Sequence, residues 1–74
     1  MKDFINNFAE IFDETDVSEF SPETNYRDID EWSSLHALAT INMIELKYSV
    51  HLKAEEMKKT NTVQELFDLI QSKK

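Results

Sequence analysis

A pair of serines followed by a leucine is the part of this sequence with the clearest chemical potential. Ser33 and Ser34 close the acidic segment Asp28–Trp32 and directly precede a helical apolar pattern. A serine at a helix start has an exposed hydroxyl, and a phosphate attached to it would lie against the positive end of the helix and its free N–H groups. The same residues also suit a structural role, with Ser33 or Ser34 as the helix cap and Trp32 as a core aromatic.

Few other side chains could do chemistry. His36 and His51 have no obvious carboxylate or serine partner in the sequence, so surface positions are expected for both. The acidic segments Asp13–Asp16 and Asp28–Glu31 suggest a calcium loop, but neither has the glycine and glutamate that the EF-hand spacing requires. Unspecific, weak ion binding is all that these acids indicate. We therefore predict no metal site, no catalytic residue and a protein that is not an enzyme.

Two residue types are missing, and their absence excludes several classes of site. The 74 residues include no glycine, which excludes phosphate-cradling loops, the dinucleotide fingerprint and the GxSxG nucleophile elbow. They include no cysteine, which excludes disulfides, thiolate zinc sites and a thiol nucleophile. No apolar stretch is long enough for a membrane span and no signal peptide opens the chain, so we expect a cytoplasmic protein.

The net charge of −7 is unevenly distributed. Residues 1–35 hold ten acids against Lys2 and Arg27, whereas residues 36–74 hold five acids against six lysines. This charge disfavours nucleic acid as a partner, because phosphate binding needs a basic face. A basic protein surface is the partner that suits this charge, although acidic residues also keep a small protein soluble.

The apolar periodicity predicts one domain, residues 1–74, of four helices without strands. The first helix is expected to be capped by Asp3, and the long loop Asp13–Ser33 separates it from the second. The apolar stripe of the first helix comprises Phe4, Ile5, Phe8, Ile11 and Phe12. The residues expected to fix the long loop to the core are Val17, Phe20, Tyr26 and Ile29.

The second helix should begin at Ser33 or Ser34 and end near Tyr48, with apolar residues on two opposite sides. One side comprises Ala37, Ile41, Ile44 and Tyr48; the other comprises Leu35, Ala39 and Leu46 with Met43 at its edge; His36, Thr40 and Lys47 form a polar strip. So small a chain has too little protein to cover both sides, which leaves one for a partner. A short helix of two turns is expected within Leu52–Lys59, and Thr62 and Glu65 form a capping box for the last helix.

From Asp30 onward the sequence resembles the acyl carrier proteins. Their mark is Asp-Ser-Leu at the start of the second helix, where the serine carries 4′-phosphopantetheine. The matching tripeptide is Ser33-Ser34-Leu35, preceded by Asp30-Glu31-Trp32, and the likeness continues through Glu55-Glu56 and Thr62–Leu66. It covers nearly the whole chain, more loosely over residues 1–27. The resemblance implies a four-helix bundle with three long helices, a short third helix and a long loop between helices one and two.

The resemblance also implies roles for individual residues. Ser34 would carry 4′-phosphopantetheine, moved from coenzyme A by a phosphopantetheinyl transferase, and the arm would bring the thiol that the chain lacks. Acyl or aminoacyl groups would be held as thioesters and presented to acyl-activating, acyltransferase or ketosynthase-type enzymes of fatty acid, polyketide or secondary metabolite biosynthesis. Docking would fall on Asp30, Glu31, Leu35, His36, Leu38, Ala39, Asn42, Glu45 and Leu46. An acyl pocket would be lined by Ile41, Ile44, Tyr48, Phe67 and Ile70.

The sequence departs from the family pattern at two places. First, Ser33 replaces the family's aspartate. Second, Glu45 is the only acid among the docking positions on the second helix, which also include His36. Partners would therefore be held by apolar contact and steered by Asp28, Asp30 and Glu31. Ser33 is the best support for an alternative, a helical interaction module that has lost the modification. A helix-turn-helix DNA binder fits the size but not the charge. We expect a monomer; the acyl group and the pathway stay open.

Overall fold

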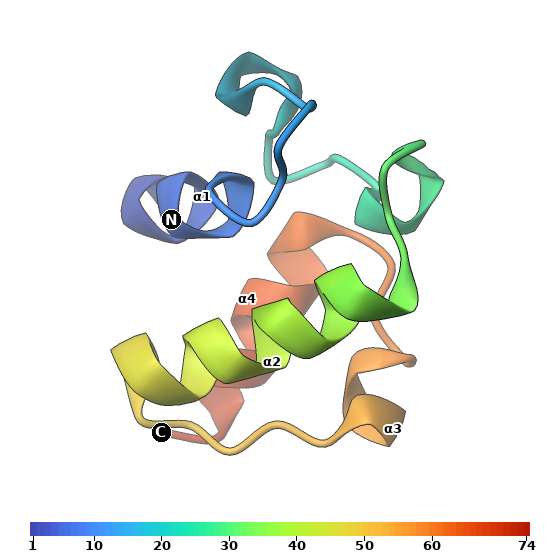
Figure 1. Cartoon of the computed structure of the whole chain (residues 1–74). Helices are drawn as coiled ribbons and strands as arrows, with labels where there is room; N and C mark the ends of the chain where they lie inside the picture. The colour runs from blue at the N-terminus through green and yellow to red at the C-terminus, as the bar shows by residue number, and fades with distance from the viewer.

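Four α-helices and two short 3₁₀ helices make up the regular structure, together with one isolated β-bridge between Asn25 and Thr62. The structure is a computed structural model that describes residues 1–74 (Figure 1). The helices in chain order are α1 (Lys2–Ala9), η1 (Val17–Glu19), η2 (Tyr26–Asp28), α2 (Ser34–Tyr48), α3 (Ala54–Met57) and α4 (Val63–Ser72). The predicted all-α class is confirmed. None of the helices combines the length and the apolar character that crossing a membrane requires.

The helix lengths differ from the prediction. Of the three helices expected to be long, α2 has 15 residues and α4 has 10, but α1 has only 8. The short helix α3, expected to have two turns, is a single turn of 4 residues. The apolar pattern of α1 continues to Phe12, yet the helix ends at Ala9. The N–H of Asp13, which would have continued the helical hydrogen bonds, instead donates to the Glu31 carboxylate at 2.7 Å. Phe12 is still buried, because the chain turns with its side chain inward.

The sequence predicted a cap for three of the four α-helices, and two of these predictions are confirmed. Ser33 caps α2 as predicted, and the capping box of Thr62 and Glu65 opens α4. The prediction for Asp3 was wrong, since Met1 occupies the cap position of α1 and no side chain caps it. Asp3 lies instead in the first turn, where its charge is favourable to the helix dipole.

α2 lies at the centre of the arrangement and packs against both α1 and α3. In Figure 1 it crosses the front of the molecule, with α4 behind it, α1 and η1 above and α3 below at its N-terminal end. The C-terminus lies near the last turn of α2, where the Lys74 ammonium is 5.4 Å from the centroid of the Tyr48 ring.

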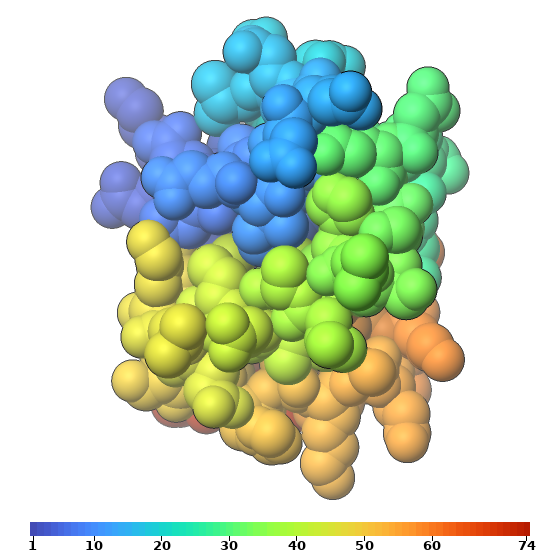
Figure 2. Space-filling model, in the orientation of Figure 1, coloured from blue at the N-terminus to red at the C-terminus, as the bar shows by residue number.

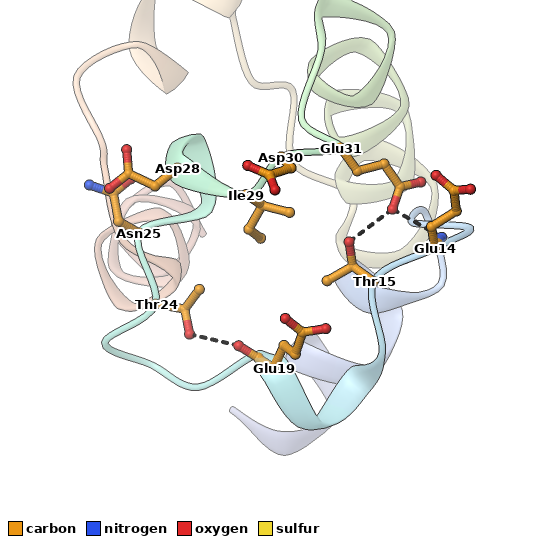
Figure 3. Close-up of a pocket in the computed structure, with 9 residues that line it drawn as sticks. All are labelled: Glu14, Thr15, Glu19, Thr24, Asn25, Asp28, Ile29, Asp30 and Glu31. Carbon is orange, nitrogen blue, oxygen red and sulfur yellow. Dashed lines mark hydrogen bonds between the residues drawn. The ribbon is translucent and has the colours of Figure 1, made fainter.

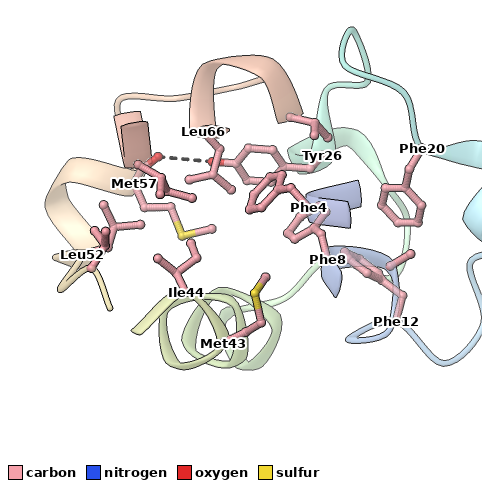
Figure 4. Packing of buried hydrophobic residues seen from close by; sticks show 14 residues of the cluster. Phe4, Phe8, Phe12, Phe20, Tyr26, Met43, Ile44, Leu52, Met57 and Leu66 are labelled. Atoms are coloured by element: carbon pink, nitrogen blue, oxygen red, sulfur yellow. Dashed lines mark hydrogen bonds between the residues drawn. The ribbon is translucent and has the colours of Figure 1, made fainter. Parts of the chain in front are cut away.

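Aromatic rings from α1 and from the long loop fill one half of the core (Figure 4). The ring of Phe8 lies between 5.3 and 5.7 Å, centroid to centroid, from those of Phe12, Phe20 and Tyr26. Such edge-to-face pairs add to the energy of burial. Aliphatic residues of the later elements fill the other half, chiefly Ile44, Val50, Leu52, Met57, Val63, Leu66 and Ile70.

The long loop is fixed by three of the four residues predicted to fix it. Phe20 and Tyr26 are buried and Ile29 packs partly against the core. The prediction for Val17 was wrong, because it lies in η1 with 47% of its surface exposed. Three backbone hydrogen bonds also join the loop to the start of α4. They run from the N–H of Tyr26 to Asn61, from Val63 to Thr24 and from Gln64 to Pro22, over 2.9 to 3.1 Å.

The two sides of α2 have different surroundings. The side with Ala37, Ile41, Ile44 and Tyr48 faces the core, as predicted. Two residues of α2 lie deeper than predicted. Met43, expected at the edge of the other apolar side, and Thr40, expected in the polar strip, are both buried. The Thr40 hydroxyl donates to the His36 carbonyl at 2.7 Å, and this satisfied donor allows a residue of the predicted polar strip to lie inside.

Candidate functional site

The two serines at the start of α2 have different hydrogen-bonding states. Ser33 precedes the helix, and its Oγ accepts a hydrogen bond from the His36 N–H at 3.4 Å and lies 2.7 Å from His36 Nδ1. Ser34 is the first helical residue, its side chain is exposed, and its hydroxyl has no hydrogen-bond partner in the chain. The free hydroxyl is therefore that of Ser34, the residue for which the family resemblance implies the attachment role.

The start of α2 favours a negative charge on Ser34. The first N–H groups of a helix have no acceptor within it, and they carry the positive end of the helix dipole. No acid occupies the first turn of α2 to neutralise that end. A phosphate on the Ser34 oxygen would thus be stabilised by the helix from which it projects.

His36 has the partners that the sequence did not reveal, and the prediction of a surface histidine was wrong. Besides Ser33 Oγ at its Nδ1, the ring has Glu31 Oε2 at 3.3 Å from Nε2. Its ring centroid lies 4.9 Å from that of Phe12. With only 18% of the side chain exposed, His36 is held between the α2 start and the end of α1.

Glu31 is the centre of this cluster. Its carboxylate accepts hydrogen bonds from the N–H groups of Asp13 and Glu14, at 2.7 and 3.0 Å, and from the Thr15 hydroxyl at 2.9 Å. Partial desolvation of the carboxylate opposes its charge, but the bonds from Asp13, Thr15, Glu14 and His36 outweigh it and lower the pKa of Glu31 to about 2. We call this group, Glu31 with Asp13, Glu14, Thr15 and His36, the Glu31 clip, because it fastens the start of α2 to the end of α1.

Serine, histidine and glutamate in this order are the components of a catalytic triad. In this chain the Glu31 carboxylate is shared with three donors besides His36, and the Ser33 hydroxyl serves as the helix cap. Ser33 lines neither of the two hollows that adjoin α2. The arrangement therefore holds the start of the helix in position, and the Ser33 hydroxyl lies at an exposed site outside both hollows.

Most of the predicted docking residues share one exposed side of α2, which we call the outer face: Leu35, Leu38, Ala39, Asn42, Glu45 and Leu46. Its leucines 35, 38 and 46 are 79%, 67% and 74% exposed. A shallow groove of about 500 Å³ runs along this face. Figure 2 shows the yellow-green atoms of α2 with no other element over them.

The other three predicted docking residues lie elsewhere or serve other contacts. Glu31 and His36 belong to the Glu31 clip, and the Glu31 side chain is only 14% exposed. Asp30 is exposed at the edge of an acidic hollow described below. The only acid of the outer face, Glu45, has its Oε1 2.9 Å from His51 Nδ1, so its charge is partnered when His51 is protonated.

A cavity of about 200 Å³, the Ser34 cavity, lies beside the attachment candidate between α2, η2 and α3. It is lined by Arg27, Trp32, Ser34, Ala37, Ile41, Ala54, Met57 and Lys58. Of the residues expected to line an acyl pocket only Ile41 takes part, while Ile44 and Ile70 are fully buried in the core. Arg27 was not predicted as a site residue. Its position as the only arginine, within the acidic half of the chain, was the signal that could have indicated a role.

An acidic hollow of about 560 Å³ lies on the loop side of the molecule (Figure 3). The fold brings the two acidic segments of the sequence together there, around Glu14, Glu19, Asp28, Asp30 and Glu31. No three of the histidine, aspartate and glutamate side chains are arranged to hold a metal ion. The hollow is thus a concentration of negative charge near the start of α2, of the kind that attracts basic surfaces.

Comparisons of the chain with protein-family models, with curated proteins and with solved structures gave no match.

Proposed function

We propose that this chain is an acyl carrier protein whose Ser34 bears 4′-phosphopantetheine. A phosphopantetheinyl transferase would join the Ser34 oxygen, as it loses its proton, to the phosphorus that bears pantetheine in coenzyme A. The pyrophosphate bond of coenzyme A would break, and adenosine 3′,5′-bisphosphate would leave. The thiol of the arm would then hold an acyl or aminoacyl group as a thioester. The observation that carries the proposal is the free, exposed hydroxyl of Ser34 at the start of α2, next to a second serine whose hydroxyl is engaged.

The surroundings of Ser34 support this function. The outer face of α2 begins at Leu35, directly beside the attachment point, so an enzyme docked there would have the arm within reach. The four helices around one core fit the bundle expected of a carrier, with a shorter first helix than the resemblance implied. We propose that the protein is a monomer in the cytoplasm. Its partners would place basic surfaces near the acidic hollow and apolar surfaces against the outer face.

The test is the intact mass of the chain after incubation with coenzyme A and a broad-specificity transferase. We expect a gain of one phosphopantetheine in the wild type and in Ser33→Ala, and none in Ser34→Ala. Circular dichroism confirms that each variant is folded. A gain that survives Ser34→Ala, or that Ser33→Ala alone abolishes, would contradict the assignment.

The outer face favours a second candidate function, a helical interaction module without the modification. Three exposed leucines on one helix suit a protein partner whether or not Ser34 is modified. Ser33→Asp separates the two functions, since it restores the charge that the family has before the serine. Modification of Ser33→Asp but not of the wild type would indicate a transferase that requires the charge. No modification of either folded protein would favour the module.

A further inference from the structure

The Ser34 cavity has two positive charges in a chain with a net charge of −7. Arg27, which is partly buried, and Lys58, which is exposed, both line it, and neither forms an ion pair with a carboxylate. The acids of the adjacent α3 do not line the cavity, and Glu56 is engaged by Lys73 at 2.6 Å. The remaining wall is mostly apolar. Two unpaired cations facing an apolar cavity indicate an anionic ligand.

Arg27 is held in place. Its Nε and Nη2 donate to the carbonyls of Thr60 and Met57, both at 2.9 Å, and the guanidinium carbon lies 5.6 Å from the centroid of the Tyr26 ring. The Tyr26 hydroxyl donates to the same region of the chain (Figure 4), which fixes the carbonyls that hold Arg27. These bonds leave further donors of the guanidinium free, so a pre-positioned cation faces the cavity.

The size of the cavity restricts the ligand. A protein cavity of about 150 Å³ holds a benzene molecule, so this partly open cavity of about 200 Å³ can cover a short acyl group and would leave most of a long fatty chain in solvent. Because Ser34 is part of the wall, an arm attached there could fold back and bring its acyl group into the cavity.

We infer that the Ser34 cavity receives a short acyl group that ends in a carboxylate, with its charge against Arg27 and Lys58 and its methylene groups along Trp32, Ile41 and Met57. This inference rests on the proposed carrier function. It states which group the cavity would cover, a short acyl group with a terminal carboxylate, and predicts that acyl groups without that charge are covered less.

The experiment compares three acyl groups loaded onto Ser34 from their coenzyme A thioesters: adipoyl, hexanoyl and dodecanoyl. Intact mass confirms each loading. The readout is the rate of thioester cleavage by hydroxylamine at neutral pH, divided by the rate for the same thioester of coenzyme A, which removes the intrinsic reactivity of each acyl group. We expect adipoyl to be protected about threefold more than hexanoyl, the effect of a partly exposed charge pair, and dodecanoyl to be protected least.

Variants assign the protection to the cations. Lys58→Gln should remove most of the difference between adipoyl and hexanoyl, whereas Lys59→Gln, a neighbouring exposed lysine that does not line the cavity, should preserve it. Arg27→Gln tests the second cation in the same way. If Arg27→Gln fails to fold, Arg27→Lys replaces it, because lysine retains the charge but not the geometry of the guanidinium.

Three results would overturn the inference. Equal protection of adipoyl and hexanoyl would remove the carboxylate preference. Better protection of dodecanoyl would replace it with a fatty acyl preference. The third result concerns thermal stability. If Lys58→Gln lowered it equally in the protein that carries the bare arm and in the protein that carries adipoyl, the cations would bind the phosphodiester of the arm and not the carboxylate of the acyl group. All three leave the proposed function standing, because the masses show loading; a chain that never loads refutes both.

Discussion

The two sides of α2 present the same class of residue in opposite environments. Ile44 on the inner side is fully buried, whereas Leu46, two residues later, is 74% exposed. The difference lies in the rest of the chain, because α1, α3 and the core residues of α4 lie on one side of α2, and no element covers the other side in Figure 2. An apolar residue in this helix therefore contributes either to folding or to association, and its position around the helix decides which.

The largest effect is expected from shortening the inner side. Ile44→Ala should lower the free energy of unfolding by about 2–5 kcal/mol, because it leaves a cavity in the core. Leu46→Ala, the matched change on the outer face, should cost less than about 0.5 kcal/mol. Urea denaturation measures both. Similar losses in the two variants would show that the outer face is covered in solution, and a dependence on protein concentration would identify a second copy as the cover.

The cap at the start of α2 is the next test. Ser33→Ala removes the acceptor for the His36 N–H and should cost about 1 kcal/mol, within the usual range for a lost N-cap. Ser33→Asp should retain most of the stability, since aspartate caps equally well. Thermal unfolding by circular dichroism compares the three proteins. If Ser33→Ala matched the wild type, the different hydrogen-bonding states of the two serines would have no energetic basis.

The Glu31 clip makes the stability depend on pH. The folded state lowers the pKa of Glu31 from 4.5 to about 2, so the charged carboxylate stabilises the fold above pH 4.5 and this stabilisation is lost as the pH falls toward 2. Glu31→Gln should be less stable than the wild type near neutral pH and should lose less stability between pH 4.5 and 2. Three other carboxyl groups with lowered pKa values, those of Asp16, Glu56 and Glu65, keep some acid sensitivity in the variant. The measurement is the unfolding midpoint of each protein at several pH values between 4.5 and 2. If the midpoints of the wild type and Glu31→Gln fell in parallel, the charge of Glu31 would not stabilise the fold.

The smallest change in stability is expected for Leu38→Asn on the outer face. It should alter the free energy of unfolding by less than about 0.5 kcal/mol. Its effect should fall on association instead, raising the transferase KM for the chain roughly fivefold if Leu38 is worth about 1 kcal/mol in the contact. Steady-state transfer assays with wild type and variant measure it. An unchanged KM would place the docking contact outside this part of α2.

The sequence predicted features that depend on neighbouring residues. The start of α2 at Ser34 and the capping box at Thr62 follow from side chains that bond to backbone groups within one turn. The inner and outer sides of α2 follow from the helical period, and the free hydroxyl of Ser34 follows from its place one residue after the cap.

The features that were missed depend on residues far apart in the chain. Beyond the end of α1, the N–H of Asp13 donates to Glu31, 18 residues further on. His36 is a different case, because Ser33 and Glu31 are only three and five residues away, but their meeting depends on the non-helical path of the chain before α2. The Ser34 cavity is made where η2 and α3 meet α2, and no local pattern encodes that meeting.

The three backbone bonds between the long loop and the start of α4 have a consequence for how the chain is made. Val63 and Gln64 donate to Thr24 and Pro22, so these two bonds form only after residues 63 and 64 have been synthesised. On the ribosome, the loop could already contact α1 through Phe20 and the Glu31 clip, but its attachment to α4 would come later. A nascent chain that stops short of Val63 would therefore lack these bonds and leave the segment around Thr24 more open to proteases.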